Sequence, residues 1–256
     1  MTQQPKSEDQ LFRDEFEVLS VGSDEYAFTV PTVINTVIKP LPQRDAYLDI
    51  GAGHGNLTRH FSKLFKHTVI VEPNAVLFDE LLDWAKGNGV SMSGQVSAWT
   101  PDVKIDGEFD FAVMSHVLYY VDADKRRDFV KRAFDLLRPG GRLVLITVAD
   151  RGSEIAKLYQ TFFTPEYYQQ IPFADEVYEL VQKWGYKATN IPFHSDIRTP
   201  SKPGMFDVMD FLLLQRVDFK DPATAAKQDA FVDQYLTREN DFSIASPGGI
   251  VTLYKD

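Results

Sequence analysis

The stretch Asp45-Ala-Tyr-Leu-Asp-Ile-Gly-Ala-Gly-His-Gly-Asn-Leu-Thr58 decides the fold, because an apolar run meets three glycines there. The short apolar run is typical of a buried strand. Gly51, Gly53 and Gly55 allow a tight turn in which the backbone can approach a ligand closely. Beyond them, apolar side chains recur at helical spacing. The stretch therefore predicts a strand, a ligand-binding turn and a helix whose N-terminus faces the ligand.

The spacing of the glycines separates two classes of cofactor. A dinucleotide fingerprint is G-x-G-x-x-G, but this chain has G-x-G-x-G, with Asn56 where the third dinucleotide glycine would stand. A second apolar run ends in Glu72, about 20 residues after Gly51, where nucleotide-binding units place the carboxylate that accepts both ribose hydroxyls. The pattern disfavours a dehydrogenase and predicts a ligand with a free ribose diol.

Strand-like and helical patterns alternate along the middle of the chain. The strand-like segments are 46–50, 68–71, 89–92, 109–114 and 142–148. This alternation predicts an α/β fold in which a parallel sheet carries helices on both faces and binds ligands at the carboxyl ends of its strands. Upstream, a helical pattern over 26–39 contains Pro31, which predicts either a break or a helix that begins near Thr29.

The composition is that of an ordinary globular protein. The chain has 256 residues, 44% of them hydrophobic and 25% charged, with a net charge of −10. This charge disfavours nucleic acid and anionic membranes as partners, because both require a basic patch. The absence of cysteine excludes disulfides and thiolate chemistry, and no long apolar stretch predicts a leader or a membrane span. A cytoplasmic protein is expected.

Four segments, in the same order along the chain, resemble the motifs of class I S-adenosylmethionine-dependent methyltransferases. They are 48–55, 71–73, 109–121 and 137–145. The resemblance implies a Rossmann-like, seven-stranded, mostly parallel sheet. It also implies S-adenosylmethionine as the cofactor, S-adenosylhomocysteine as its product, and methyl transfer without a metal.

A single methyltransferase domain is expected over residues 1–256. The expected parts are an N-terminal helical cap over 1–41, a cofactor-binding core over 42–150, a helical, aromatic cover of the substrate after the fifth strand over 151–186, and C-terminal strands and helices that complete the sheet over 187–256.

The resemblance also assigns a set of cofactor-binding residues. Asp49 is expected to anchor the glycine loop by accepting backbone N–H bonds, or to hold a water near the cofactor's amino group. Gln95 and Val96 are expected to follow the third strand, where related enzymes present an acid and an apolar residue to the adenine. The full set is Asp49, Gly51, Gly53, Gly55, Glu72, Pro73, Gln95, Val96 and Ser115.

Three residues at the end of the fourth strand are the catalytic candidates. His116 could serve as a general base or could pack within its loop. Tyr119 and Tyr120 are expected to form an aromatic wall of the substrate site, where a ring face stabilises a sulfonium or ammonium cation.

The subgroup with the strongest resemblance is the histamine N-methyltransferase-like proteins, through 71–74, 117–122 and 172–180. The subgroup's N-terminal acid could correspond to Glu17 or Glu25, but its substrate-binding asparagine has no counterpart around 246–249. The expected acceptor is therefore a small nitrogen nucleophile, an amine or a heterocycle, rather than histamine itself. O-methylation with His116 as base and a non-catalytic cofactor-binding protein are the alternatives. A monomer or a homodimer is expected.

Overall fold

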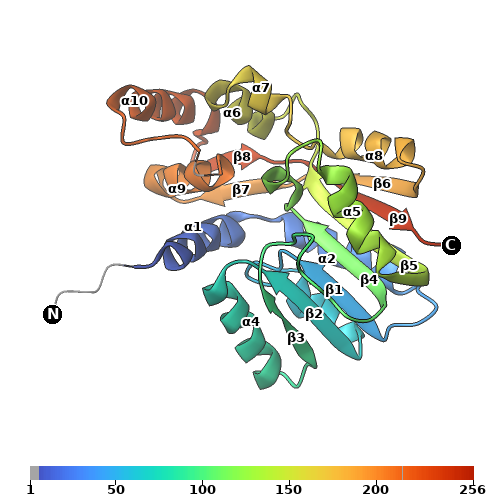
Figure 1. The fold of residues 1–256 in the computed structure, drawn as a ribbon. Helices are drawn as coiled ribbons and strands as arrows, with labels where there is room; N and C mark the ends of the chain where they lie inside the picture. The colour runs from blue at the N-terminus through green and yellow to red at the C-terminus, as the bar shows by residue number, and fades with distance from the viewer. Residues whose placement is uncertain (1–5, 215) are drawn as a thin grey trace.

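A seven-stranded sheet forms the centre of the computed structural model, which describes residues 6–214 and 216–256 (Figure 1). The strand order is β3-β2-β1-β4-β5-β9-β6, and β9 alone runs opposite to the other six strands. The strands are β1 (Ala46–Ile50), β2 (His67–Glu72), β3 (Met92–Val96), β4 (Phe109–Ser115), β5 (Leu137–Val148), β6 (Lys187–Phe193) and β9 (Gly248–Tyr254). The predicted Rossmann-like sheet is confirmed.

Helices cover both faces of this sheet, because successive strand residues point alternately into two apolar cores. Leu48 and Ile50 of β1 belong to the core on one face, under α5 (Arg126–Asp135) and α8 (Ala174–Lys183). Tyr47 belongs to the core on the other face. That second face is covered by α2 (Glu25–Val33), α3 (Thr58–Phe61), η2 (Ser62–Leu64) and α4 (Ala75–Gly87).

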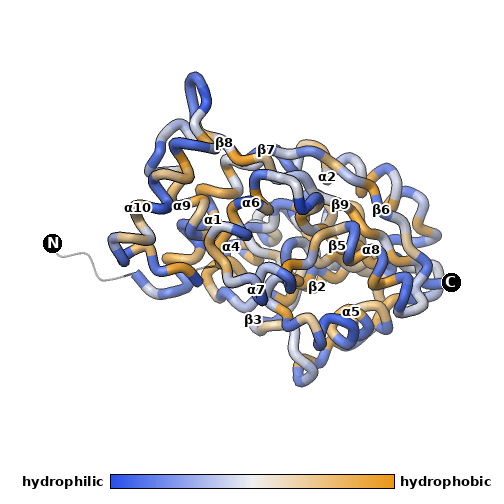
Figure 2. Tube along the Cα trace, turned by 90° about the horizontal axis from the view of Figure 1, so that it is seen from above, coloured by the Kyte–Doolittle hydropathy of each residue, from blue (hydrophilic) through white to orange (hydrophobic). Residues whose placement is uncertain are grey.

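A third apolar core lies above the carboxyl ends of the strands, within a group of elements that we call the cover. Buried Tyr159 and Phe173 belong to this core. The cover consists of α6 (Glu154–Phe162), α7 (Pro165–Tyr168), β7 (Asp196–Thr199), α9 (Lys202–Leu212), α10 (Pro222–Phe231), η4 (Val232–Leu236) and β8 (Phe242–Ala245). Figure 1 shows these elements together on one side of the sheet, and Figure 2 shows apolar colour at the strands and polar colour at the outer loops.

Helix α1 (Glu8–Gly22) lies between the cover and the sheet, with α9 on one side and α4 on the other (Figure 1). Its N-terminus is fixed by a capping box in which Ser7 and Gln10 exchange side-chain and backbone hydrogen bonds. Residues 1–5 of the predicted cap lie outside the described residues. No helix in the described part of the chain is both long and apolar enough to cross a bilayer.

The expectation for Pro31 was wrong. Helix α2 begins at Glu25, runs through Pro31 and continues as the π-helical turn η1 (Ile34–Ile38) instead of breaking. Proline removes one N–H donor from the ladder, but Val33, Val37 and Ile38 are buried against the sheet, and this packing holds the segment helical. The wider turn closes where the Lys39 N–H donates to the Ile34 carbonyl at 2.9 Å.

One predicted boundary was also wrong. The third strand was expected at 89–92, but β3 covers Met92–Val96, because α4 extends to Gly87 and a turn through Gly89 follows it. Gln95 and Val96 are therefore part of the strand. The helix predicted after the glycine turn is present as α3 followed directly by η2, whereas the short sheet of β7 and β8 was not expected at all.

Gly55 has no side chain, and this allows the glycine turn to pack closely against α4. Its φ is +76°, and a Cβ there would lie 2.6 Å from Cδ1 of Leu81 on α4. We predict that Gly55→Ala lowers the free energy of unfolding by about 2–4 kcal/mol, from backbone strain and overpacking together. Gly89→Ala is the matched control: its φ is +66°, but nothing lies within 4 Å of the added atom. Gly89→Ala should lower the free energy of unfolding, measured by urea denaturation, by about 1–2 kcal/mol. Equal losses for both variants would contradict the packing role.

Candidate active site

Two adjoining cavities open at the carboxyl ends of the strands. The larger has a volume of about 920 Å³ and the smaller about 100 Å³. The residues that line both are Phe16, Gly51, Ser115, His116, Tyr120 and Phe211. The two spaces therefore meet around the end of β4, where the sequence placed its catalytic candidates.

The glycine turn forms one wall of the larger cavity. The Gly51 N–H donates to the Val71 carbonyl at 2.7 Å, which fastens the turn to β2. Gly53 has a φ of +53°, and a Cβ on it would lie 2.5 Å from the ring of Phe16. Gly51 and Gly53 line the larger cavity, whereas Gly55 lines neither. The first two positions could thus face a ligand, while the third contacts α4.

Glu72 lies buried at the end of β2, where it also lines the larger cavity. Its Oε2 accepts the Gly53 N–H at 2.8 Å and its Oε1 accepts the Asn74 N–H at 2.9 Å. Burial raises the pKa of Glu72, and the two backbone hydrogen bonds oppose this rise. A carboxylate has about four lone-pair sites, so about two remain toward the cavity. That number suits a pair of neighbouring hydroxyls.

Asp49 is buried below the smaller cavity, and its partners differ from the expected ones. Its carboxylate accepts hydrogen bonds from the hydroxyls of Thr58, at 2.6 Å, and Tyr47, not from backbone N–H groups. Burial raises the pKa of Asp49 to about 6. The residue anchors the start of α3 to β1 through its side chain.

The predicted adenine contacts are not supported by their placement. Gln95 and Val96 are exposed on β3 and line neither cavity, and Gln95 donates instead to the Lys104 carbonyl at 2.8 Å. The residues that line the larger cavity beyond β3 are Ala98, Trp99, Thr100 and Pro101. Pro73 lines it on the β2 side, and its contact with the cofactor stays a prediction. The presence of a large aromatic residue soon after the third strand was the sequence signal that could have identified the cavity wall beyond β3.

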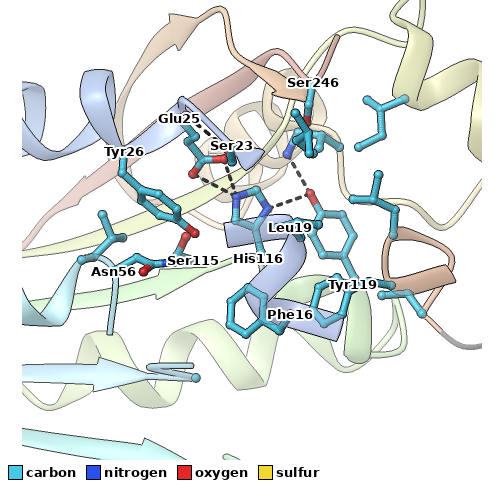
Figure 3. Close-up of a pocket in the computed structure, with 18 of the residues that line it drawn as sticks. Phe16, Leu19, Ser23, Glu25, Tyr26, Asn56, Ser115, His116, Tyr119 and Ser246 are labelled. Carbon is cyan, nitrogen blue, oxygen red and sulfur yellow. Dashed lines mark hydrogen bonds and ion pairs between the residues drawn. The ribbon is translucent and has the colours of Figure 1, made fainter. Parts of the chain in front are cut away.

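His116 is held between two partners at the end of β4 (Figure 3). Its Nε2 lies 3.0 Å from both carboxylate oxygens of Glu25, and the Tyr119 hydroxyl lies 3.4 Å from its Nδ1. The backbone at His116 is left-handed, with φ at +55°. Burial lowers the pKa of His116, but the charge and hydrogen bond of Glu25 outweigh this effect and leave the pKa above 6.5. The Glu25 carboxylate therefore shifts the protonation equilibrium of His116 toward the imidazolium form.

Of the two candidate acids, Glu25 reaches the site and Glu17 does not. Glu17 is exposed on α1 and pairs with Arg13. Glu25 is buried at the first turn of α2 and lines the smaller cavity. The separation of 91 residues between Glu25 and His116 explains why sequence patterns alone could not pair them.

The two tyrosines of η3 (Leu118–Tyr120) have different surroundings. Tyr119 is only 8% exposed, and its hydroxyl accepts the Val148 N–H at 2.7 Å and contacts Thr147 Oγ1 at 2.6 Å. Tyr120 is 54% exposed and lines both cavities. Of the expected aromatic wall, Tyr120 thus offers an open ring face, whereas Tyr119 ties the end of β4 to β5.

Sequence reasoning missed a pair of aromatic rings between the cavities. Phe16 of α1 and Phe211 of α9 stack in parallel, with ring centroids 4.9 Å apart and an interplanar angle of 5°. Each of these two rings lines both cavities.

Helix α1 is also attached to the sheet near Glu72. Asp9 of α1 accepts the Ala75 N–H at 3.1 Å, so α1 is fastened to the turn that follows Glu72.

A family model for a methyltransferase domain matches residues 25–194 of the chain. The chain belongs to this family. The membership confirms the predictions of a methyltransferase and of S-adenosylmethionine as its cofactor. The model is broader than the histamine N-methyltransferase-like subgroup, which stays a prediction.

One curated relative and several solved structures are similar to this methyltransferase. An uncharacterized methyltransferase of Geobacillus kaustophilus is 28% identical over 147 residues, which are 57% of this chain and 60% of that protein. The chain thus spans about three fifths of the relative's length. A putative methyltransferase from Bacillus halodurans has a TM-score of 0.63 at 14% identity and covers 89% of this chain and 98% of its own. The YcgJ protein from Bacillus subtilis has a TM-score of 0.60 at 14% identity and covers 88% of this chain and 99% of its own. These structural likenesses show the fold.

The larger cavity of the methyltransferase fits its cofactor. Small-molecule sites enclose about 300–1,000 Å³, a range that includes this cavity. Glu72 offers free lone pairs at one end of the cavity, and Gly51 brings unobstructed backbone to it.

Removing the carboxylate of Glu72 tests this fit. We predict that Glu72→Ala weakens the binding of S-adenosylhomocysteine by ~1.5–3 kcal/mol, because the acceptor of two hydroxyl bonds is lost. The Gly53 and Asn74 N–H groups also lose their acceptor, so the variant should be less stable by ~1–2 kcal/mol. Calorimetry and thermal unfolding separate the two effects. Glu108→Ala, which removes an exposed carboxylate, is the control. Destabilisation with unchanged affinity would make Glu72 purely structural.

The ion pair predicts a pH-dependent stability. An imidazole with a raised pKa contributes stability that is complete below the unfolded pKa of about 6.5 and is lost as the pH rises through the folded value. Glu25→Gln should therefore lower the pKa of His116, followed by NMR. Its cost in unfolding free energy should be larger at about pH 6 than at about pH 9. Glu17→Gln, on the exposed face of α1, should leave the pKa of His116 unchanged. A pKa of His116 insensitive to Glu25→Gln would refute the pairing.

Proposed function

We propose that this methyltransferase transfers a methyl group to a nitrogen of a small molecule, an amine or a heterocycle, by an SN2 step without a metal. The observation that supports nitrogen is the state of His116. One ring nitrogen contacts Glu25 and the other contacts the Tyr119 hydroxyl, so neither is free to take a proton from an acceptor. A neutral nitrogen attacks through its lone pair and needs no such base.

S-adenosylmethionine supplies, when bound, a methyl group that its sulfonium sulfur has already activated. The protein's part is then to hold the acceptor in line and to exclude water, and such positioning can contribute about 7–11 kcal/mol to lowering the barrier. We assign cofactor binding to the larger cavity, with Glu72 toward the ribose and Gly51, Gly53, Pro73 and Ser115 around the remainder. Asp49, which lines only the smaller cavity, supports the cofactor site from beneath by holding the start of α3 to β1. The acceptor then occupies the smaller cavity.

Tyr120 is the residue that we assign to the junction of cofactor and acceptor. It is the more exposed of the two tyrosines and lines both cavities. A ring face stabilises a desolvated cation by up to about 2 kcal/mol. Positive charge passes from sulfur to the acceptor nitrogen during the reaction, so a ring at the junction lies near it throughout.

The second candidate function is O-methylation with His116 as general base. The contact that favours it is the one with Glu25, which fixes the ring and the proton on Nε2 and leaves Nδ1 as the basic atom. This route requires Nδ1 to exchange the Tyr119 hydroxyl for that of the acceptor. The histamine N-methyltransferase-like subgroup, by contrast, agrees with the nitrogen proposal.

The net charge of −10 supports a small-molecule acceptor rather than a nucleic acid or a membrane surface. We also propose that residues 1–256 act as one domain, as a monomer or a homodimer.

Substitutions of His116 and Tyr120 separate the two functions. For a nitrogen acceptor, we predict that His116→Ala lowers kcat by less than about tenfold, whereas the loss of a base for a hydroxyl acceptor would cost ~10²–10⁴-fold. Tyr120→Ala should lower kcat/KM by up to about 30-fold through the lost ring face. Labelled methyl transfer to a panel of amines, heterocycles and phenols provides the measurement, with Tyr178→Ala on α8, outside both cavities, as the control. A hundredfold loss for His116→Ala, with the methyl found on oxygen, would overturn the proposal.

A further inference from the structure

Tyr159 carries a buried hydroxyl group that has no hydrogen-bond partner. The residue lies on α6 in the cover and is only 3% exposed. Of the two cavities, it lines the smaller one only. Within the part of the chain that the structure describes, no donor or acceptor bonds its Oη. Buried hydroxyls are normally hydrogen-bonded, so this exception points to a partner that comes from outside the chain.

The hydroxyl of Tyr159 faces open space rather than a packed core. The described side-chain atoms that are fully enclosed without a hydrogen bond are Ser62 Oγ, Thr68 Oγ1, Asn190 Oδ1 and Thr252 Oγ1. Tyr159 Oη also lacks a partner but is not among them, so it keeps accessible surface. Because the residue is almost fully buried and lines the smaller cavity, that surface belongs to the cavity. A molecule in the cavity can therefore reach this hydroxyl.

Packing holds the Tyr159 ring in place. The ring stacks on that of Phe163, with centroids 5.4 Å apart and an interplanar angle of 16°. Burial raises the pKa of Tyr159, so its hydroxyl stays protonated and can donate a hydrogen bond. The other side chains of α6, β7 and α9 that line the smaller cavity are apolar, namely Ile155, Ile197, Phe211 and Leu212. Tyr159 thus places one fixed polar group in an apolar wall, an arrangement typical of sites that orient a small molecule.

The same cavity has a second free hydroxyl, that of Ser246 between β8 and β9 (Figure 3). Ser246 is 6% exposed. Its N–H donates to the Ser195 carbonyl at 2.8 Å, and its own carbonyl accepts the Ser195 hydroxyl, so its backbone is fixed. Its Oγ bonds no other described residue and is not fully enclosed. The polar character of the cavity is therefore not confined to the end that faces the cofactor site.

We propose that Tyr159 determines the specificity of the acceptor site by donating a hydrogen bond to a second polar group of the acceptor. The acceptor then carries a hydroxyl or carbonyl oxygen in addition to the nitrogen that receives the methyl group. A molecule without such an oxygen leaves the Tyr159 hydroxyl dehydrated and unpaired, a cost that the bonded acceptor avoids. The inference rests on the proposed function and narrows it, from an amine or heterocycle to one with a second polar group.

Binding without turnover tests this proposal. The protein is saturated with S-adenosylhomocysteine, and ligand-observed NMR measures the affinities of aniline, 3-aminophenol and 4-aminophenol. The three probes share a ring and a nitrogen, and two of them add a hydroxyl. At least one aminophenol should bind the wild type about three- to tenfold more tightly than aniline, a ratio that corresponds to one net hydrogen bond. If aniline binds as tightly as both aminophenols, the proposal is overturned.

Tyr159→Phe removes the hydroxyl and keeps the ring. The advantage of the aminophenol over aniline should fall below about twofold in this variant, while the affinity for aniline stays the same. Tyr235→Phe is the matched control, because Tyr235 lies on η4 in the same cover and lines neither cavity. This control should keep the wild-type ratio. An unchanged ratio in folded Tyr159→Phe, as expected if only water bonds the hydroxyl, would refute the proposal.

Thermal unfolding separates recognition from a structural role. Because the Tyr159 hydroxyl has no partner in the described chain, Tyr159→Phe should not lower the melting temperature. Tyr119→Phe should lower it, since the Val148 N–H and the Thr147 hydroxyl lose their contact. An equal loss for both variants would assign the Tyr159 hydroxyl to the fold and overturn the proposal. Failure to bind S-adenosylhomocysteine, or to methylate any acceptor, would count against the proposed function instead.

Discussion

The turn from Gly51 to Gly55 is the constraint on which both cavities depend. All three of its glycines have positive φ, and at each a Cβ would come within 2.6 Å of a neighbouring side chain. The crowded neighbours belong to three different places: Val117 after β4, Phe16 on α1 and Leu81 on α4. One turn without side chains thus lets the end of the sheet, the cap helix and a flanking helix approach the same backbone.

Three buried carboxylates at this end of the sheet are stabilised in three different ways. Glu72 accepts backbone N–H groups, Asp49 accepts hydroxyls, and Glu25 pairs with an imidazole. A backbone N–H cannot move away, so Glu72 keeps its remaining lone pairs directed at the larger cavity. Burial raises the pKa of Asp49 to about 6 although its two hydroxyl partners oppose the rise, and Glu25 lies in contact with the imidazole of His116. The larger cavity therefore keeps the acceptor capacity of Glu72, while in the smaller cavity the Glu25 carboxylate is already in contact with His116.

The features that were predictable from the sequence are those encoded locally. The strand, the glycine turn and Glu72 lie within a short stretch, and their spacing follows from strand and helix geometry. The path of α2 through Pro31 was not predictable, because distant packing overrides the local preference of proline. The Glu25–His116 pair joins residues 91 positions apart, and no periodicity reports such a contact. Gln95 was predicted to follow the third strand but lies within it, because this strand begins later than the apolar pattern suggested.

The origin of the cavity walls explains this division. The proposed cofactor residues fall within the first half of the chain, at the ends of strands whose apolar side chains form the cores of the sheet. The acceptor cavity is closed by α1, α6, β7 and α9, whose apolar side chains belong largely to a separate core. Because that core does not include the strands that carry Glu72 and the glycine turn, substitutions of Ile155, Tyr159 or Ile197, which line only the smaller cavity, can reshape that cavity without changing the lining of the larger one. The acceptor is therefore the property that the motifs reveal least, and the geometry of Glu25, His116 and the cover is the physical basis on which it can be inferred.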